Sequence, residues 1–145
     1  MSNDTLLKVD HLKKHFYTPY GTLFAVDDVS FSIKEGETLG VVGESGCGKS
    51  TLGRAVLRLC EPTSGTVFFD GEDVLKFNKA KMKKMRSQMQ IIFQDPYASL
   101  NPRMTVSQSI AAPLIIQGVY KSSEKDMIHK LVFQTLDLVG LVKRF

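Results

Sequence analysis

The residues best suited to chemistry form one glycine-rich segment in the first third of the chain. It fits the pattern G-x-x-x-x-G-K-[ST], which cradles phosphate groups when it lies between a strand and a helix. Glycine frees the backbone so that many N–H groups point into one concavity, and the following helix adds the positive end of its dipole. We therefore expect a polyphosphate site built from Gly43, Glu44, Ser45, Gly46, Cys47, Gly48, Lys49, Ser50 and Thr51.

Two side chains of this segment have distinct expected roles. Lys49 brings a positive charge to the β and γ phosphates of a nucleotide, and the Ser50 hydroxyl is a ligand for Mg²⁺. The alternative is a glycine-rich turn that is followed by Lys-Ser by chance. The flanking sequence favours the phosphate site, because a strand-like run precedes the segment and helical spacing follows it.

The elements that must position this loop can be predicted from their hydrophobic patterns. Residues 38–42 form a short apolar run without polar alternation, which is typical of a strand covered on both faces. Residues 50–59 carry apolar side chains at helical spacing. The expected order is therefore strand, glycine loop, helix.

Further elements are expected on both sides of this unit. Alternating apolar residues predict half-buried strands, and helical spacing predicts amphipathic helices. Ser122 or Ser123 is the expected N-cap of the last helix, and Gly140 follows its end. The expected strands are residues 7–12, 26–33, 66–69 and 90–93, and the expected helices are residues 79–88, 106–116 and 123–139.

Length and composition limit the class of protein. The chain has 145 residues, which is typical of one domain, with 43% hydrophobic and 23% charged residues, as in folded globular proteins. The longest uncharged stretch, residues 104–120, is interrupted by polar residues and Pro113, so a membrane span is not expected. The polar, acidic N-terminus lacks the pattern of a signal peptide, which favours a cytoplasmic location.

Cysteine count and charge exclude two further classes of site. Cys47 and Cys60 are too few for a disulfide framework and have no zinc-ligand spacing, so free thiols are expected. The formal net charge is +4, and much of the excess falls on the expected helix at residues 79–88. No aromatic residue interleaves with these cations, which favours a solvated face over a nucleic-acid site.

A longer set of residues resembles the nucleotide-binding domain of ABC transporters. It includes F-A-V-D-D-V-S-F at residues 24–31, the glycine loop, P-T-S-G-T-V at residues 62–67 and F-D-G at residues 69–71. The decapeptide F-Q-D-P-Y-A-S-L-N-P at residues 93–102 is similar to the Q-loop region of the oligopeptide and dipeptide importer ATPases, whose relatives include nickel and glutathione uptake systems. The resemblance covers nearly the whole chain from about Leu6 onward.

The fold that this resemblance implies is α/β. It is a P-loop NTPase with a RecA-like core of parallel strands and helices, an N-terminal antiparallel β subdomain and the start of a helical subdomain, truncated. Residues 1–145 are then a partial ATP-binding domain. Residues 1–99 hold the antiparallel β subdomain and the P-loop core, and residues 100–145 begin the helical subdomain.

The resemblance also implies roles for individual residues. Residues 43–51 become the Walker A loop, and Gln94 becomes the Q-loop glutamine, which contacts Mg²⁺ and the attacking water. On sequence alone, a glutamine at a strand end is usually a surface residue. Phe16 is the residue expected to stack on adenine, with Tyr17 as the neighbouring alternative. Lys49 and Gln94 are thus the expected catalytic residues, and Ser50 and Gln94 the expected metal ligands.

The implied function is that of the ATP-binding subunit of an ABC importer. Such a subunit uses ATP and Mg²⁺, and it couples ATP binding and hydrolysis to uptake of dipeptides, oligopeptides or a related solute. Its implied place is the cytoplasmic face of the cell membrane. Its implied partners are a second ATPase subunit in a head-to-tail dimer, transmembrane permease subunits and, indirectly, a solute-binding protein.

The sequence departs from the family pattern in one respect. The family's signature motif, Walker B motif and switch histidine follow the start of the helical subdomain, and none is found in these 145 residues; His11, His15 and His129 lie at other positions. The alternative expectation is a nucleotide-binding fragment that does not hydrolyse ATP by itself. A P-loop GTPase or small-molecule kinase is less favoured, because a motif such as N-K-x-D does not occur.

Overall fold

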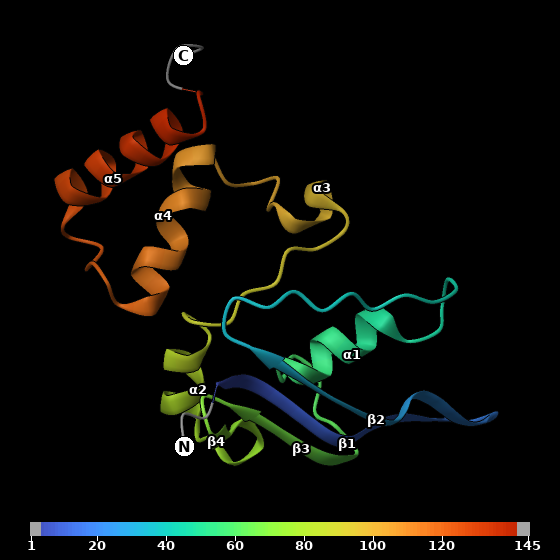
Figure 1. Ribbon diagram of the computed structural model, residues 1–145. Coiled ribbons are helices and arrows are strands. Elements are labelled where there is room, and N and C mark those ends of the chain that lie inside the picture. The colour runs from blue at the N-terminus through green and yellow to red at the C-terminus, as the bar shows by residue number, and fades with distance from the viewer. Residues whose placement is uncertain (1–3, 142–145) are drawn as a thin grey trace. The chain divides into compact units, whose positions relative to one another are not determined.

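The first unit of the structure is built on a four-stranded antiparallel sheet (Figure 1). The computed structural model describes residues 4–141, and the chain divides into two compact units between Met89 and Gln90. The strands lie in the order β2-β1-β3-β4. They are β1 (Thr5–Thr18), β2 (Gly21–Lys34), β3 (Ser64–Phe69) and β4 (Glu72–Asp73). The expected antiparallel β subdomain is therefore confirmed.

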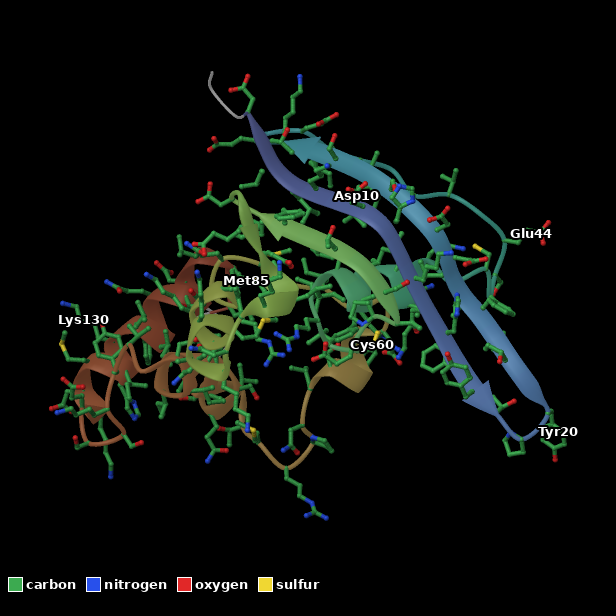
Figure 2. All side chains as sticks on the ribbon, turned by 90° about the horizontal axis from the view of Figure 1, so that it is seen from below. Asp10, Tyr20, Glu44, Cys60, Met85 and Lys130 are labelled. Carbon is green, nitrogen blue, oxygen red and sulfur yellow. The ribbon has the colours of Figure 1, made fainter. Side chains whose placement is uncertain are left out.

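The hairpin formed by β1 and β2 is longer than the rest of the sheet. β3 pairs with β1 only as far as the pair Lys13 and Ser64, whereas β1 and β2 pair as far as Thr18 and Gly21. The outer part of the hairpin is thus a ribbon of two strands, and Tyr20 marks its tip (Figure 2). Within the part of the chain that the structure describes, no third strand pairs with this outer part.

The core lies between this sheet and the helix α1 (Lys49–Val56). Leu12 and Val67 of the sheet are fully buried, and Ala55 of the helix is also fully buried. Next to β4, the 3-10 helix η1 (Val74–Lys76) and the helix α2 (Lys79–Met85) close the core with Val74, Met82 and Met85. The expected helices at residues 50–59 and 79–88 are confirmed, although each ends about three residues early.

Two expected strands do not form. Residues 38–42 and 90–93 are irregular, and the side chains of Val42 and Ile92 are 93% and 98% exposed. A strand needs a neighbour for its N–H and C=O groups. No strand among residues 4–141 pairs with either segment. The prediction of two covered parallel strands was therefore wrong for the described residues.

The second unit begins at Gln90 and is helical. It contains α3 (Pro96–Ser99), α4 (Val106–Gln117) and α5 (Lys125–Leu138), and α4 contacts α5. The predicted helices at residues 106–116 and 123–139 are confirmed. Among the described residues of this unit, only Ile128 and Val132 of α5 are buried hydrophobic residues. No helix within residues 4–141 is long and apolar enough to cross a membrane.

The two long helices of this unit begin differently. Thr105 and Gln108 form a capping box at the start of α4, with reciprocal side-chain to backbone hydrogen bonds of 3.2 and 2.9 Å. The N-cap of α5 is Glu124. Its carboxylate accepts a hydrogen bond from the backbone N–H of Lys121 and closes a turn before the helix. The prediction of Ser122 or Ser123 as the N-cap was wrong for this reason.

Candidate nucleotide-binding site

The glycine loop leads directly into α1. Gly48 is the N-cap of this helix and has φ of 98°, and Gly46 has φ of 80°. Such a left-handed conformation costs an L-residue roughly 1–2 kcal/mol but is freely open to glycine. The expected junction of loop and helix is therefore confirmed, and glycine at these two positions allows the chain to turn there.

Gly48 also fixes where the helix starts relative to the sheet. A Cβ atom at this position would lie 1.9 Å from the carbonyl oxygen of Ala25 in β2, a backbone atom that cannot easily move aside. Only glycine therefore permits this close approach of α1 to β2. The role of Ala25 was not found by sequence reasoning, because no local pattern marks a contact between residues so far apart in the chain.

Lys49 folds back over the loop that precedes it. Its Nζ atom donates hydrogen bonds to the carbonyl oxygens of Gly43, at 2.8 Å, and Glu44, at 2.6 Å. The same atom lies 3.5 Å from the Sγ atom of Cys47. These contacts bring Gly43, Glu44, Cys47 and Lys49 together. The ammonium group is held at the loop by neutral carbonyl oxygens, and negatively charged phosphate oxygens would accept stronger hydrogen bonds from it.

The start of α1 is suited to an anion. No side chain caps it and its first turn contains no acidic residue, while the N–H of Leu52 already bonds to the carbonyl of Gly48 at 2.8 Å. The N–H groups of the three residues before Leu52 have no acceptor within the helix. They lie at the positive end of the helix dipole. These features, together with Lys49, fit the phosphate groups of a nucleotide.

Other loop residues are accessible to a ligand. Ser50 is exposed and Thr51 is half-buried, while Glu44, Ser45 and Cys47 are exposed. Cys47 and Cys60 are both free thiols, as expected. Within residues 4–141, no group of three or more His, Cys, Asp or Glu side chains could hold a metal ion. Among the loop residues, the exposed Ser50 hydroxyl is a group that could ligate Mg²⁺ together with phosphate oxygens.

The expected base-stacking residues lie on the outer part of the hairpin. Phe16 is 40% exposed and pairs with Leu23 of β2, and the Nζ atom of Lys14 lies 4.8 Å from the centre of its ring. Tyr17 is 78% exposed. Both residues belong to the same unit as the glycine loop.

Gln94 belongs to the second unit. It is exposed and lies in irregular chain just before α3, rather than at the end of a strand. The first unit thus brings together the loop, α1 and the hairpin that carries Phe16, and Gln94 lies outside this group.

Comparison with known proteins identifies the family. A family model described as "ABC transporter" matches residues 26–145. The chain belongs to the ABC transporter family.

The chain is similar to ATP-binding proteins of oligopeptide transport. It is 53% identical to the oligopeptide transport ATP-binding protein OppF of Bacillus subtilis over an alignment of 141 residues, which spans 97% of this chain and 46% of OppF. It is 47% identical over 137 residues to the putative oligopeptide transport ATP-binding protein YkfD of the same organism, covering 94% of this chain and 41% of YkfD. The chain spans less than half the length of these two relatives.

Solved structures of this family have the same fold. The ATP-binding cassette MJ0796, in a dimeric post-hydrolysis state bound to ADP and Pi, superposes with a TM-score of 0.77 at 27% identity, over 96% of this chain and 59% of MJ0796. CbiO1 from Clostridium perfringens, part of the ABC transporter complex cbiONQ, gives a TM-score of 0.68 at 29% identity, over 97% of this chain and 53% of CbiO1. The expected fold class, that of an ABC ATPase, is confirmed.

Proposed function

We propose that this chain binds ATP through residues 43–51 and belongs to the ATPase subunit of an ABC importer. In the whole protein, ATP hydrolysis would drive uptake of oligopeptides or a related solute. One observation carries the proposal: the Lys49 ammonium is held over the glycine loop, 2.8 and 2.6 Å from its carbonyl oxygens, at the uncapped start of α1. The printed names of OppF and YkfD support the substrate class.

Binding of the triphosphate would use groups that the loop already positions. Lys49 would exchange the carbonyl oxygens of Gly43 and Glu44 for oxygens of the β and γ phosphates. The backbone N–H groups at the start of α1 would donate to the same phosphates. The Ser50 hydroxyl would ligate Mg²⁺, which neutralises charge on the phosphates when bound. Each of these groups acts by holding charge in place rather than by covalent chemistry.

The position of Phe16 in the hairpin supports it over Tyr17 as the residue that stacks on the base. Phe16 and Tyr17 are adjacent in the regular outer part of the hairpin, so their side chains point to opposite faces of β1. The partner of Phe16, Leu23, is two residues from Ala25, where the start of α1 meets β2.

The remaining roles rest on the family. Gln94 would contact Mg²⁺ and the attacking water, and its exposed position leaves it free to do so. The proposed partners are a second ATPase subunit in a head-to-tail dimer, permease subunits at the cytoplasmic face of the membrane and, indirectly, a solute-binding protein. The dimeric state of MJ0796 with ADP and Pi supports the first of these partners and the use of ATP.

Calorimetric titration with MgATP tests the proposal. Lys49→Ala removes a charged donor, and a hydrogen bond to a charged group is worth roughly 1.5–3 kcal/mol, so ATP should bind at least about tenfold more weakly. Lys83→Ala is the matched control, because Lys83 is an exposed lysine of α2 and should leave the affinity unchanged. Equal affinity of the Lys49→Ala variant and the unaltered chain would contradict the assignment of the loop.

A further inference from the structure

His15 is the most enclosed of the histidine and aspartate side chains that pair across the hairpin. Its side chain is 14% exposed, compared with 54% for Asp27 and 74% for His11. Its Nε2 atom lies 3.3 Å from Oδ1 of Asp27. Because a carboxylate can only accept, Nε2 carries the proton in this hydrogen bond. The imidazole also contacts the ring of Phe24 edge-on, at 4.5 Å between centroids.

The backbone of the same residue is tied to the chain that follows α1. The N–H of His15 donates to Oγ1 of Thr63 at 2.9 Å, and the N–H of Thr63 donates to the carbonyl oxygen of Lys13 at 2.7 Å. Thr63 lies between the end of α1 and β3. At the other end of α1, Gly48 abuts Ala25 of β2. The hairpin is thus attached both at the start of the helix that follows the glycine loop and to the chain just before β3.

These attachments stop immediately before the residue that is proposed to stack on the base. Phe16 follows His15 directly, and among residues 4–141 no strand other than β1 and β2 pairs beyond this point. Phe16 itself pairs with Leu23, and the hydrogen bond between His15 and Thr63 is the nearest attachment that ties this part of β1 to chain outside the hairpin. A ring that is held before the ligand arrives loses less conformational freedom on binding.

We propose that His15, through its hydrogen bonds to Asp27 and Thr63, is a positioning residue that holds Phe16 for stacking on the nucleotide base. This inference rests on the proposed function, because it requires ATP bound at residues 43–51. The two parts of the site then have different roles. The glycine loop and Lys49 bind the phosphates, whereas the pair of His15 and Asp27 determines the affinity for the base.

Comparison of two ligands tests this difference in roles. The affinities of MgATP and of Mg²⁺ tripolyphosphate, which has no base, are measured by calorimetry. His15→Leu should weaken MgATP binding about tenfold, which is within the range for losing an aromatic stack on a base. Tripolyphosphate should bind as tightly as before. His15→Gln keeps a side-chain N–H donor for Asp27 and should restore most of the affinity for ATP.

His11→Leu is the matched control. It removes a similar hydrogen bond, 2.8 Å from His11 Nδ1 to Asp28 Oδ1, on an exposed part of the same hairpin. This variant should bind both ligands like the unaltered chain. If His15→Leu weakens both ligands equally, or neither, then His15 does not position the base-stacking residue and the inference is overturned. If the unaltered chain binds neither ligand, the proposed function itself fails.

Discussion

Two sets of apolar segments in this chain are predicted as strands but have different structures. In the antiparallel sheet, Leu12 and Val67 are fully buried, whereas Val42 and Ile92 of the irregular segments at residues 38–42 and 90–93 are almost fully exposed. The difference lies in the availability of partners. β1 pairs with β2, to which it is joined by a two-residue turn. β1 also pairs with β3, which follows α1 in the chain, and all three strands belong to the first unit. No strand among the described residues pairs with either irregular segment.

The same contrast bears on how the glycine loop is held. The segment on the N-terminal side of the loop, residues 38–42, is irregular and does not join the sheet. On the C-terminal side of the loop, Gly48 abuts Ala25 and α1 is packed in the core. The shape of the loop therefore depends on this second side and on the hydrogen bonds of Lys49.

The largest expected effect contrasts the two apolar regions directly. Leu12→Ala removes a fully buried side chain and should lower the free energy of unfolding by about 2–5 kcal/mol. Ile92→Ala removes an exposed one and should change it by less than about 0.5 kcal/mol. Urea denaturation followed by circular dichroism measures both. Comparable losses in the two variants would mean that residues 90–93 are covered in solution.

An effect of comparable size is expected where the helix meets the sheet. Gly48→Ala forces a side chain into the left-handed region and against the carbonyl of Ala25, whereas Gly46→Ala meets open space and has only the strained backbone. Backbone strain alone costs about 1–3 kcal/mol of the free energy of unfolding. Gly46→Ala should therefore lower that free energy by about this amount, and Gly48→Ala should lower it further because of the clash with Ala25. The same denaturation experiment distinguishes them. Equal losses would show that the close approach to Ala25 does not exist.

The hairpin offers a third contrast, with an effect on binding. Phe16→Ala should weaken MgATP about tenfold, in line with the loss of a base stack, while Tyr17→Ala should change the affinity by less than about twofold. Both side chains are exposed and adjacent, so neither substitution should alter the core. The reverse order of effects would move the stacking role to Tyr17.

The sequence predicted those parts of the fold and site that depend on near neighbours. The helix after the loop, the strands at residues 7–12 and 26–33 and the helix at residues 106–116 follow from local patterns. Residues 38–42 were mispredicted because strand formation depends on partners distant in the chain. The contact of Ala25 with Gly48 and the attachment of His15 to Thr63 join residues 23 and 48 positions apart, which no local pattern can reveal.

Thiol labelling provides the most direct test that phosphates bind in the loop. Cys47 lies between Gly46 and Gly48 beside the Lys49 ammonium, and Cys60 is an internal control that follows α1. Peptide mapping after brief maleimide treatment, with and without MgATP, measures both cysteines in one sample. With ATP at ten times its dissociation constant, labelling of Cys47 should slow about tenfold while labelling of Cys60 stays constant. Equal labelling of Cys47 with and without MgATP would contradict nucleotide binding at residues 43–51.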